Sequence, residues 1–179
     1  MTGTRTGQVR KMAARGTGAV LVALLFTPAA LAAQSASVTP DPADAEAGAI
    51  ATITALFDAM RASDAETMRG LFAGQVAGFP SSYVNQENDP VIRFGDLDEF
   101  MESVASAEPG SLDEQIVVRD VLVDDNLVTV VTPYTFTYQG TLSHCGVNVF
   151  LIARQGEDWK VAGLADTRRR AGCEGWLDE

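Results

Sequence analysis

Apolar residues recur at helical spacing from residue 41 onwards. Asp41 can cap a helix, Pro42 suits the first turn, and the apolar positions that follow lie three or four residues apart. These positions are Ile50, Ile53, Leu56, Phe57 and Met60. The pattern predicts a helix from Asp41 to about Ala62 with one side buried.

Two shorter helices are predicted after this one. Ser63, followed three residues later by a glutamate, has the pattern of a capping box, and the helix that it begins is expected to end at Gly74. Asp96 has the same pattern ahead of an apolar face and predicts a third helix. The stretch 75–94 between them is weaker, and it predicts at most one short strand and a loop.

The last third of the chain has the composition of a sheet. Four segments rich in Val, Ile, Thr and aromatic residues are separated by short turn sequences. They are 115–123, 127–138, 141–154 and 159–167. Connections this short do not form parallel crossovers, so we expect an antiparallel meander with the helices packed on one face. The predicted fold class is α+β.

The N-terminus is typical of an export signal. Basic residues precede the apolar run 19–26, which is shorter than the about 20 residues that span a membrane, and Ala30-Leu31-Ala32 offers the small residues of a cleavage site. We therefore expect a periplasmic or secreted protein without a stable membrane anchor. The expected organisation is a signal peptide at 1–33, a flexible leader at 34–40, one domain at 41–171 and a C-terminal tail at 172–179.

Charge and composition exclude several function classes. The first 33 residues hold 4 of the 13 basic side chains and none of the 24 acidic ones, which leaves 9 basic and 24 acidic groups and a formal charge of -15. Nucleic acids bind basic side chains that neutralise phosphates, so no nucleic-acid partner is expected. One His and two Cys do not complete a structural zinc site, and no phosphate-binding loop lies in the mature chain, so no metal and no cofactor are expected.

Export determines how the two cysteines are interpreted. An oxidising compartment favours a disulfide between Cys145 and Cys173, for which the chain after the last strand must fold back over the sheet. If that strand follows a turn at 156–157, Cys145 lies opposite about Arg168. Two unpaired thiols are the alternative.

The order of elements resembles a known superfamily. Three helices followed by a long curved antiparallel sheet resemble the nuclear transport factor 2-like superfamily. The stretches 144–154, 158–161 and 165–169 are similar to the final hairpin of its SnoaL-like members. The resemblance covers about Asp41 to Arg170. It implies a cone-shaped, cystatin-like fold whose helices roof a concave sheet, and often a dimer through a sheet face. Ketosteroid isomerase shares this superfamily, but its catalytic residues do not match positions in this chain.

Alternation along the segment 141–154 sorts side chains between a cavity face and an outer face. His144, Gly146, Asn148, Phe150 and Ile152 point one way, and the residues between them, including Cys145, point the other way. We expect the even-numbered face to line the cavity. One extra residue in the following turn would change which side His144 shares with Trp159 and Asp166.

These faces supply the candidate site residues. His144 and Asp166 are candidate acid–base groups, although a hydrogen-bonded sheet histidine and an ion pair between Asp166 and a nearby arginine are the simpler alternatives. The candidate ligand-binding residues are Asn148, Phe150, Tyr134, Tyr138, Phe57 and Trp159. The run 168–170 of three arginines either holds an anionic ligand or forms a solvated strand end.

Three functions remain open at this point. The first is an exported, dimeric protein that binds a small apolar or carbonyl-bearing molecule without established catalysis. The second is an acid–base enzyme of isomerase, dehydratase or cyclase type that acts on such a molecule. The third is a dimeric protein-interaction module whose sheet face binds another protein and whose cavity is filled by side chains.

Overall fold

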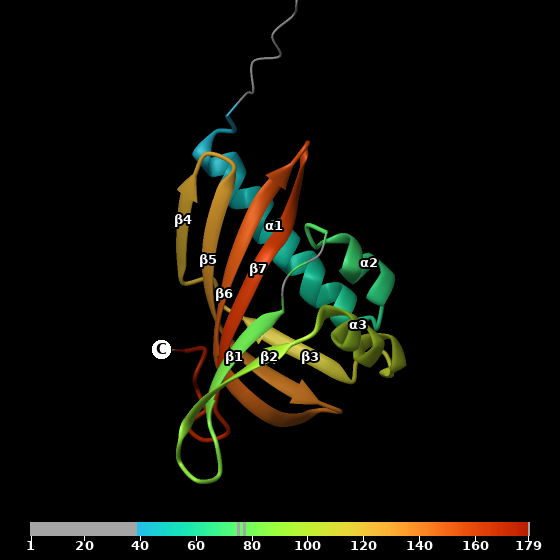
Figure 1. Cartoon of the computed structure of the whole chain (residues 1–179), viewed down its shortest axis with the longest axis vertical. Helices are drawn as coiled ribbons and strands as arrows, with labels where there is room; N and C mark the ends of the chain where they lie inside the picture. The colour runs from blue at the N-terminus through green and yellow to red at the C-terminus, as the bar shows by residue number, and fades with distance from the viewer. Residues whose placement is uncertain (1–38, 75, 77, 179) are drawn as a thin grey trace, which may run out of the picture. The chain divides into compact units, whose positions relative to one another are not determined.

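A computed structural model describes residues 39–178 except 75 and 77. The predicted signal peptide lies outside these residues, as does most of the leader. The helices are α1 (Pro42–Arg61), α2 (Ala65–Gly70) and α3 (Leu97–Ser106), and the strands are β1 (Phe79–Val84), β2 (Pro90–Gly95), β3 (Leu112–Ile116), β4 (Asp120–Asp124), β5 (Leu127–Tyr138), β6 (Thr141–Gln155) and β7 (Asp158–Arg168). Figure 1 shows the helices gathered on one side of the sheet.

α1 forms where its sequence pattern predicts. The Asp41 carboxylate accepts a hydrogen bond from the Ala43 N–H at 2.9 Å, and Pro42 occupies the first turn. The apolar stripe that includes Ile53 and Leu56 is buried against the sheet. Burial of each such side chain stabilises the fold by about 1.5 to 3 kcal/mol, so this stripe fixes α1 on the sheet.

The start of α2 differs from the prediction, because Ser63 belongs to the end of α1. Ser63 has a positive φ of 58° and its N–H donates to the Met60 carbonyl, while the Asp64 N–H donates to the Ala59 carbonyl. These two bonds form a Schellman motif that terminates α1. Asp64 caps α2 instead by accepting from the Thr67 N–H at 3.0 Å, and the helix ends at Gly70 rather than Gly74.

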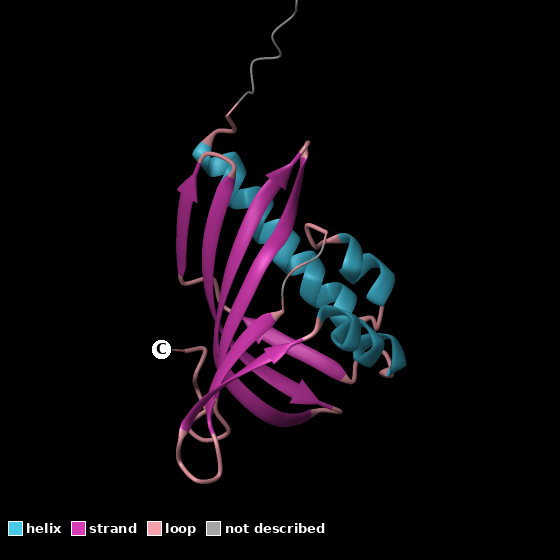
Figure 2. Cartoon of the chain, in the orientation of Figure 1, coloured by secondary structure: helices cyan, strands magenta, loops and turns pink. Residues whose placement is uncertain are grey.

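The strands form one curved, mixed sheet (Figure 2). Its order is β2-β1-β7-β6-β5-β3, and β4 also pairs with β5. The expectation of a single short strand within 75–94 was wrong, because β1 and β2 form a hairpin there. β1 pairs in parallel with β7, so the sheet is not antiparallel throughout.

The predicted strand 115–123 is two strands, because its register against β5 shifts by one residue. Ile116 lies opposite Tyr134, whereas Asp120 lies opposite Val131. The four steps from Ile116 to Asp120 therefore correspond to only three steps along β5. An extra residue of this kind bends the strand away from regular pairing, and it divides the segment into β3 and β4.

A bulge in β7 decides which residues share a face. Leu151 pairs with Gly163 but Ile152 pairs with Val161, which leaves Ala162 as an extra residue. A one-residue insertion reverses the alternation of side chains along a strand. An odd-numbered residue before the bulge therefore faces the same way as an even-numbered residue after it. Asp166 therefore faces the helices beside Asn148, and the even-numbered face of β6 lines the interior as predicted.

The disulfide between Cys145 and Cys173 is present, which confirms the sequence prediction. The Cα atoms of the two residues are 5.6 Å apart. Cys145 lies opposite Arg169 rather than Arg168, because the β7 bulge advances the register by one residue. The tail is held further by Trp176, whose indole Nε1–H donates to the Gly146 carbonyl at 2.8 Å.

The sheet face that points away from the helices carries exposed apolar residues. Leu122, Thr129 and Leu151 lie side by side on neighbouring strands, and Leu122 and Leu151 are exposed. The homodimer expected from the family resemblance stays a prediction.

Within the described part of the chain, none of the helices combines the length and the apolar character that crossing a membrane requires.

Candidate functional site

The concave side of the sheet and the helices enclose a small inner pocket. Its volume is about 70 Å³. Most of its wall is apolar and comes from the helices, β1 and β7, and the polar side chains come from the sheet. The lining residues are Leu56, Phe57, Met60, Met68, Phe79, Ser81, Phe100, Glu114, Asn148, Leu164, Asp166 and Arg168.

Three strands bring the polar side chains together. Asn148 of β6 lies directly opposite Asp166 of β7 in the register of the sheet. Glu114 reaches the same place from β3, where Asn148 Nδ2 donates to its Oε1 at 2.8 Å. Two carboxyl groups and one amide therefore meet at the polar end of an apolar pocket.

The Glu114 carboxyl holds its proton more tightly than an ordinary glutamate does. Burial in the inner pocket, with a smaller contribution from the negative charge of Asp166, raises the pKa of Glu114 to about 7. The hydrogen bond from Asn148 and the positive charge of Arg168 act in the opposite direction. Near neutral pH this carboxyl is present in both its protonated and its ionised form.

Asp166 is held on one oxygen and open on the other. Its Oδ2 accepts from Arg168 Nε at 2.7 Å and more weakly from the Tyr134 hydroxyl at 3.4 Å. The hydroxyl of Tyr134 donates more closely to the Thr167 carbonyl, at 3.0 Å. Asp166 Oδ1 is buried, and among the described residues it has no hydrogen-bond partner. That oxygen is an unused acceptor on a side chain that borders the inner pocket.

Tyr134 supports this carboxylate as a neutral hydrogen-bond donor. Burial, together with the charges of Asp166 and Glu114, raises the pKa of the Tyr134 hydroxyl well above its usual value. The phenol therefore keeps its proton at any physiological pH. Tyr134 is fully buried and does not border the inner pocket itself. Its hydroxyl helps to orient the Asp166 carboxylate, which does border the pocket.

His144 borders a different cavity, an open outer cleft of about 720 Å³. Its ring lies against Tyr134 and Phe136, with ring centroids 5.7 and 5.0 Å away, and its Nδ1 is 3.1 Å from Ser143 Oγ. Burial, and then the positive charge of Arg168, lowers the pKa of His144 to about 4. The imidazole is therefore neutral at physiological pH.

The two predicted acid–base residues lie in neighbouring cavities. His144 faces the outer cleft and Asp166 the inner pocket, and no hydrogen bond joins them among the described residues. Arg168 borders both cavities and is bonded to Asp166. The ion pair that the sequence allowed as an alternative for Asp166 is therefore present, while the second carboxylate oxygen remains open.

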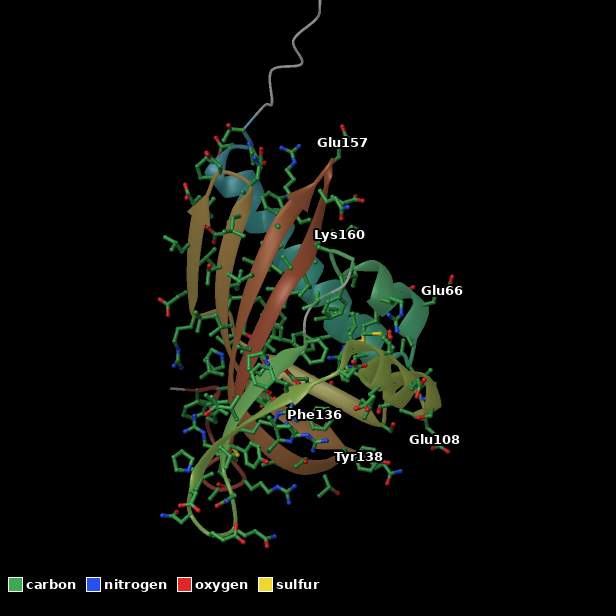
Figure 3. The ribbon with its side chains drawn as sticks, in the orientation of Figure 1. Glu66, Glu108, Phe136, Tyr138, Glu157 and Lys160 are labelled. Carbon is green, nitrogen blue, oxygen red and sulfur yellow. A yellow bond between two sulfur atoms is a disulfide. The ribbon has the colours of Figure 1, made fainter. Side chains whose placement is uncertain are left out.

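Of the six predicted ligand-binding residues, Asn148 and Phe57 line the inner pocket, and Tyr134 and the three described next do not. Phe150 is core, with its ring 6.0 Å from that of Phe57 in an edge-to-face contact. Trp159 packs on α1, where its side chain fills the space above Gly48. Tyr138 is half exposed and lies with Phe136 at the end of the sheet opposite Glu157 (Figure 3).

Glu114 is the polar pocket residue that the sequence did not predict. The predicted strand began at residue 115, one position too late to include it. Leu112, Glu114 and Ile116 share one face of β3 by alternation, and the two apolar neighbours pack against the core. A charged residue between two core positions was the available signal.

The polar groups of the pocket suit an organic ligand better than a metal. Across the described residues, no three His, Cys, Asp or Glu side chains gather closely enough to hold a metal ion. One carboxyl that takes up a proton near neutral pH, one amide and one open carboxylate oxygen can donate to and accept from a polar group of a small molecule. The fold and the site together define a class of protein, an α+β cone with a buried carboxyl pair in an apolar pocket.

Solved structures with the same architecture carry the nuclear transport factor 2-like fold, and this chain has that fold. A protein of unknown function from Silicibacter pomeroyi has a TM-score of 0.56 at 12% identity, covering 73% of this chain and 100% of its own. One from Shewanella baltica has a TM-score of 0.54 at 10% identity, covering 74% and 99%. A proposed dehydratase of this family from Streptomyces avermitilis has a TM-score of 0.50 at 18% identity, covering 73% and 100%. No family model and no curated protein matches the sequence.

Proposed function

We propose that this protein binds a small, largely apolar molecule or molecular fragment in the inner pocket and orients the part held there through a polar group. The observation that carries the proposal is Asp166 Oδ1, a buried carboxylate oxygen without a partner among the described residues, at the polar end of an apolar cavity. An unpaired buried acceptor costs about 1 to 3 kcal/mol. A ligand that donates a hydrogen bond to it recovers that free energy.

The disulfide and the sequence of the first 33 residues support binding after export, in the periplasm or outside the cell. The ligand class follows from the walls of the pocket. Leu56, Met60 and Met68 contact the apolar body, and a hydroxyl or an amide N–H meets Asp166. Asn148 and the protonated form of Glu114 complete the polar end.

Two matched probes test this proposal. Cyclopentanol carries a hydroxyl donor and cyclopentane has the same ring without it, so only the first can satisfy Asp166. We expect cyclopentanol to shift the amide NMR resonances of Leu164 and Asp166, and to bind about ten- to a hundredfold more weakly to Asp166→Asn. Asp124→Asn, an exposed carboxylate at the end of β4, serves as the control and leaves binding unchanged.

The proposal is wrong if cyclopentanol leaves these pocket resonances unmoved, or if cyclopentane binds equally well. A ligand that binds with equal affinity to the wild-type protein and to Asp166→Asn also contradicts it. Folding of each variant is checked by its NMR spectrum before binding is measured.

A second candidate function is proton transfer on the bound molecule. It is favoured by the difference between the two carboxyl groups, since Glu114 has a pKa of about 7 and Asp166 is ion-paired with Arg168. Asp166 Oδ1 would remove a proton from carbon next to a carbonyl, while protonated Glu114 donates a hydrogen bond to the carbonyl oxygen.

Hydrogen–deuterium exchange of cyclopentanone in D₂O, followed by NMR, tests this second function. A proton-transferring pocket accelerates exchange at the carbons next to the carbonyl, and both Asp166→Asn and Glu114→Gln abolish the acceleration. Exchange at the rate of the buffer alone excludes catalysis on this ketone class and leaves the binding proposal intact.

A further inference from the structure

The outer cleft and the inner pocket are neighbouring cavities that share part of their walls. Phe79, Ser81, Phe100 and Arg168 line both cavities. Two of these residues are phenylalanines whose ring centroids are 5.8 Å apart. The boundary between the two cavities is therefore formed by two aromatic rings, a serine and a guanidinium group.

Positive charge is concentrated at the outer cleft. Arg93, Arg168, Arg169 and Arg170 border it, and these are four of the nine basic residues that follow residue 33. The three consecutive arginines all border the cleft, where β7 ends at Arg168 and Arg169 forms a further bridge with Cys145. In a chain of strongly negative net charge, this clustering creates a local site for an anion.

The arginines differ in how far they are already occupied. Arg168 is paired with Asp166, and the guanidinium of Arg169 lies 3.8 Å from the ring centroid of Trp176. Arg93 and Arg170 have no ion pair or hydrogen bond from their side chains among the described residues. These two guanidinium groups are available to a ligand.

The sheet register places Arg93 and Arg168 on the two strands that flank β1. Ser81 of β1 lies directly opposite Arg93 of β2, and Tyr83 of β1 lies beside Arg168 of β7. His144 feels the positive charge of both Arg168 and Arg170, which places these residues within electrostatic reach of one imidazole.

Two acidic residues also border the cleft. Asp96 is engaged, because its carboxylate accepts the N–H groups of Asp98 and Glu99 at the start of α3. Asp96 keeps its negative charge in these hydrogen bonds, and Glu99 is the second acidic side chain at the cleft. The four arginines that border the cleft outnumber these two acidic residues.

We infer that the ligand is an amphipathic organic anion, whose carboxylate lies in the outer cleft between Arg93 and Arg170 and whose apolar part passes Phe79 and Phe100 into the inner pocket. A guanidinium group binds a carboxylate through two parallel N–H donors, which a neutral ligand does not match. The inference rests on the proposed function for the apolar end of the ligand. Its new element is the charged end and the residues that recognise it.

His144 reports on the anion, because it is the only histidine of the chain. The charges that act on its imidazole are Arg168, Arg170 and Asp166, and Asp96 and Glu99 share its cleft. An anion bound between the arginines offsets their positive charge and raises the pKa of His144 from about 4 toward its ordinary value of 6.5. A protein prepared without a histidine tag gives one imidazole signal for an NMR titration.

Hexanoate, hexanamide and inorganic phosphate are the probes. Hexanoate has both an apolar chain and a carboxylate, hexanamide has the same chain without charge, and phosphate has charge without a chain. We expect hexanoate to raise the His144 pKa by about half a unit or more and to shift the amide resonance of Leu164. Hexanamide leaves the His144 pKa unchanged, and phosphate leaves Leu164 unchanged.

Charge variants identify the residues that hold the carboxylate. Arg93→Gln and Arg170→Gln each weaken hexanoate binding about fivefold or more, and neither changes the binding of cyclopentanol. Arg119→Gln is the matched control, because Arg119 is an exposed arginine between β3 and β4 that does not border the cleft. It leaves hexanoate binding unchanged.

Failure of this inference can be distinguished from failure of the proposed function. If hexanamide binds as tightly as hexanoate, or if the arginine variants bind hexanoate as well as the wild-type protein, the anionic end is wrong and the pocket proposal survives. If hexanoate moves the His144 pKa but leaves Leu164 unmoved, the ligand does not enter the inner pocket, and the amphipathic inference is overturned. If the wild-type protein does not bind cyclopentanol but hexanoate gives all the results expected above, only the proposed function is overturned.

Discussion

Two titratable side chains of the site respond to burial with opposite changes in proton affinity. The pKa of Glu114 rises from 4.5 to about 7, and the pKa of His144 falls from 6.5 to about 4. In both cases burial disfavours the charged form. The two residues are therefore linked to folding stability with opposite signs.

The pH dependence of stability follows from these two shifts. The folded protein holds the Glu114 proton more tightly than the unfolded chain, so the stability from Glu114 is complete below pH 4.5 and is lost as the pH rises through 7. The folded protein disfavours charged His144, so the stability linked to His144 is complete above pH 6.5 and is lost as the pH falls through 4. Between pH 4.5 and 6.5 the two effects oppose one another.

Single variants separate the two effects. Glu114→Gln removes the decline in the free energy of unfolding between pH 5 and pH 8, which we expect to be on the order of 2 to 3 kcal/mol. His144→Gln removes a smaller decline on the acid side, because His144 is partly exposed to solvent screening. Urea denaturation across this pH range measures both, and equal pH profiles for Glu114→Gln and the wild-type protein would contradict the assignment.

At the scale of elements, close contact between β6 and β7 depends on a residue without a side chain. A Cβ atom added at Gly146 would overlap the Thr167 carbonyl group and lie 3.0 Å from Tyr134 Cε1. Thr167 is the residue whose carbonyl accepts the Tyr134 hydroxyl. Because Gly146 has no side chain, β7 can lie close enough for the Thr167 carbonyl to accept a hydrogen bond from Tyr134, whose hydroxyl also contacts Asp166.

We expect Gly146→Ala to destabilise the protein by about 3 kcal/mol, because overpacking against a backbone carbonyl is not relieved by a rotamer change. It should also weaken cyclopentanol binding, since the Asp166 support moves with β7. Gly70→Ala is the control, because no atom lies within 4 Å of an added Cβ there. Thermal unfolding compares the two variants, and equal midpoints would show that β6 and β7 are not in this close contact.

The elements also show what the sequence predicts and what it does not. The helix caps at Asp41 and Asp96 follow from local chemistry, and the structure confirms both. The bulge at Ala162 has no local signal, because a single inserted residue depends on how two long strands pair. Asp166 was a candidate from its residue type, but its position beside Asn148 was fixed by that bulge.

Register also explains why Glu114 was missed and why β1 was underestimated. The boundary of a strand depends on its partner, and β3 begins where Leu112 meets Tyr138 of β5. β1 is held by β2 and by β7, which is distant in sequence, so its own pattern is weak. Local periodicity therefore predicted the class of fold, while pairing between distant strands determined the membership of the site.

At the scale of the whole molecule, the C-terminal tail connects the disulfide to the charged edge of the outer cleft. Cys173 is bonded to Cys145 of β6, Trp176 donates to the Gly146 carbonyl, and Arg169 lies over the Trp176 ring. Arg170 lies between these fixed points, so the position of its guanidinium depends on the tail.

The double variant Cys145→Ser with Cys173→Ser tests this dependence. In the chain-entropy account, opening a loop of 28 residues lowers the free energy of unfolding by about 3.5 kcal/mol. Below the unfolding temperature, we expect the variant to bind cyclopentanol like the wild-type protein, because the inner pocket lies under the helices. Hexanoate binding should weaken, because Arg169 and Arg170 are no longer held at the cleft. Calorimetry of both probes measures the difference, and an equal loss for cyclopentanol and hexanoate would show that the disulfide supports the whole sheet rather than the charged edge of the cleft.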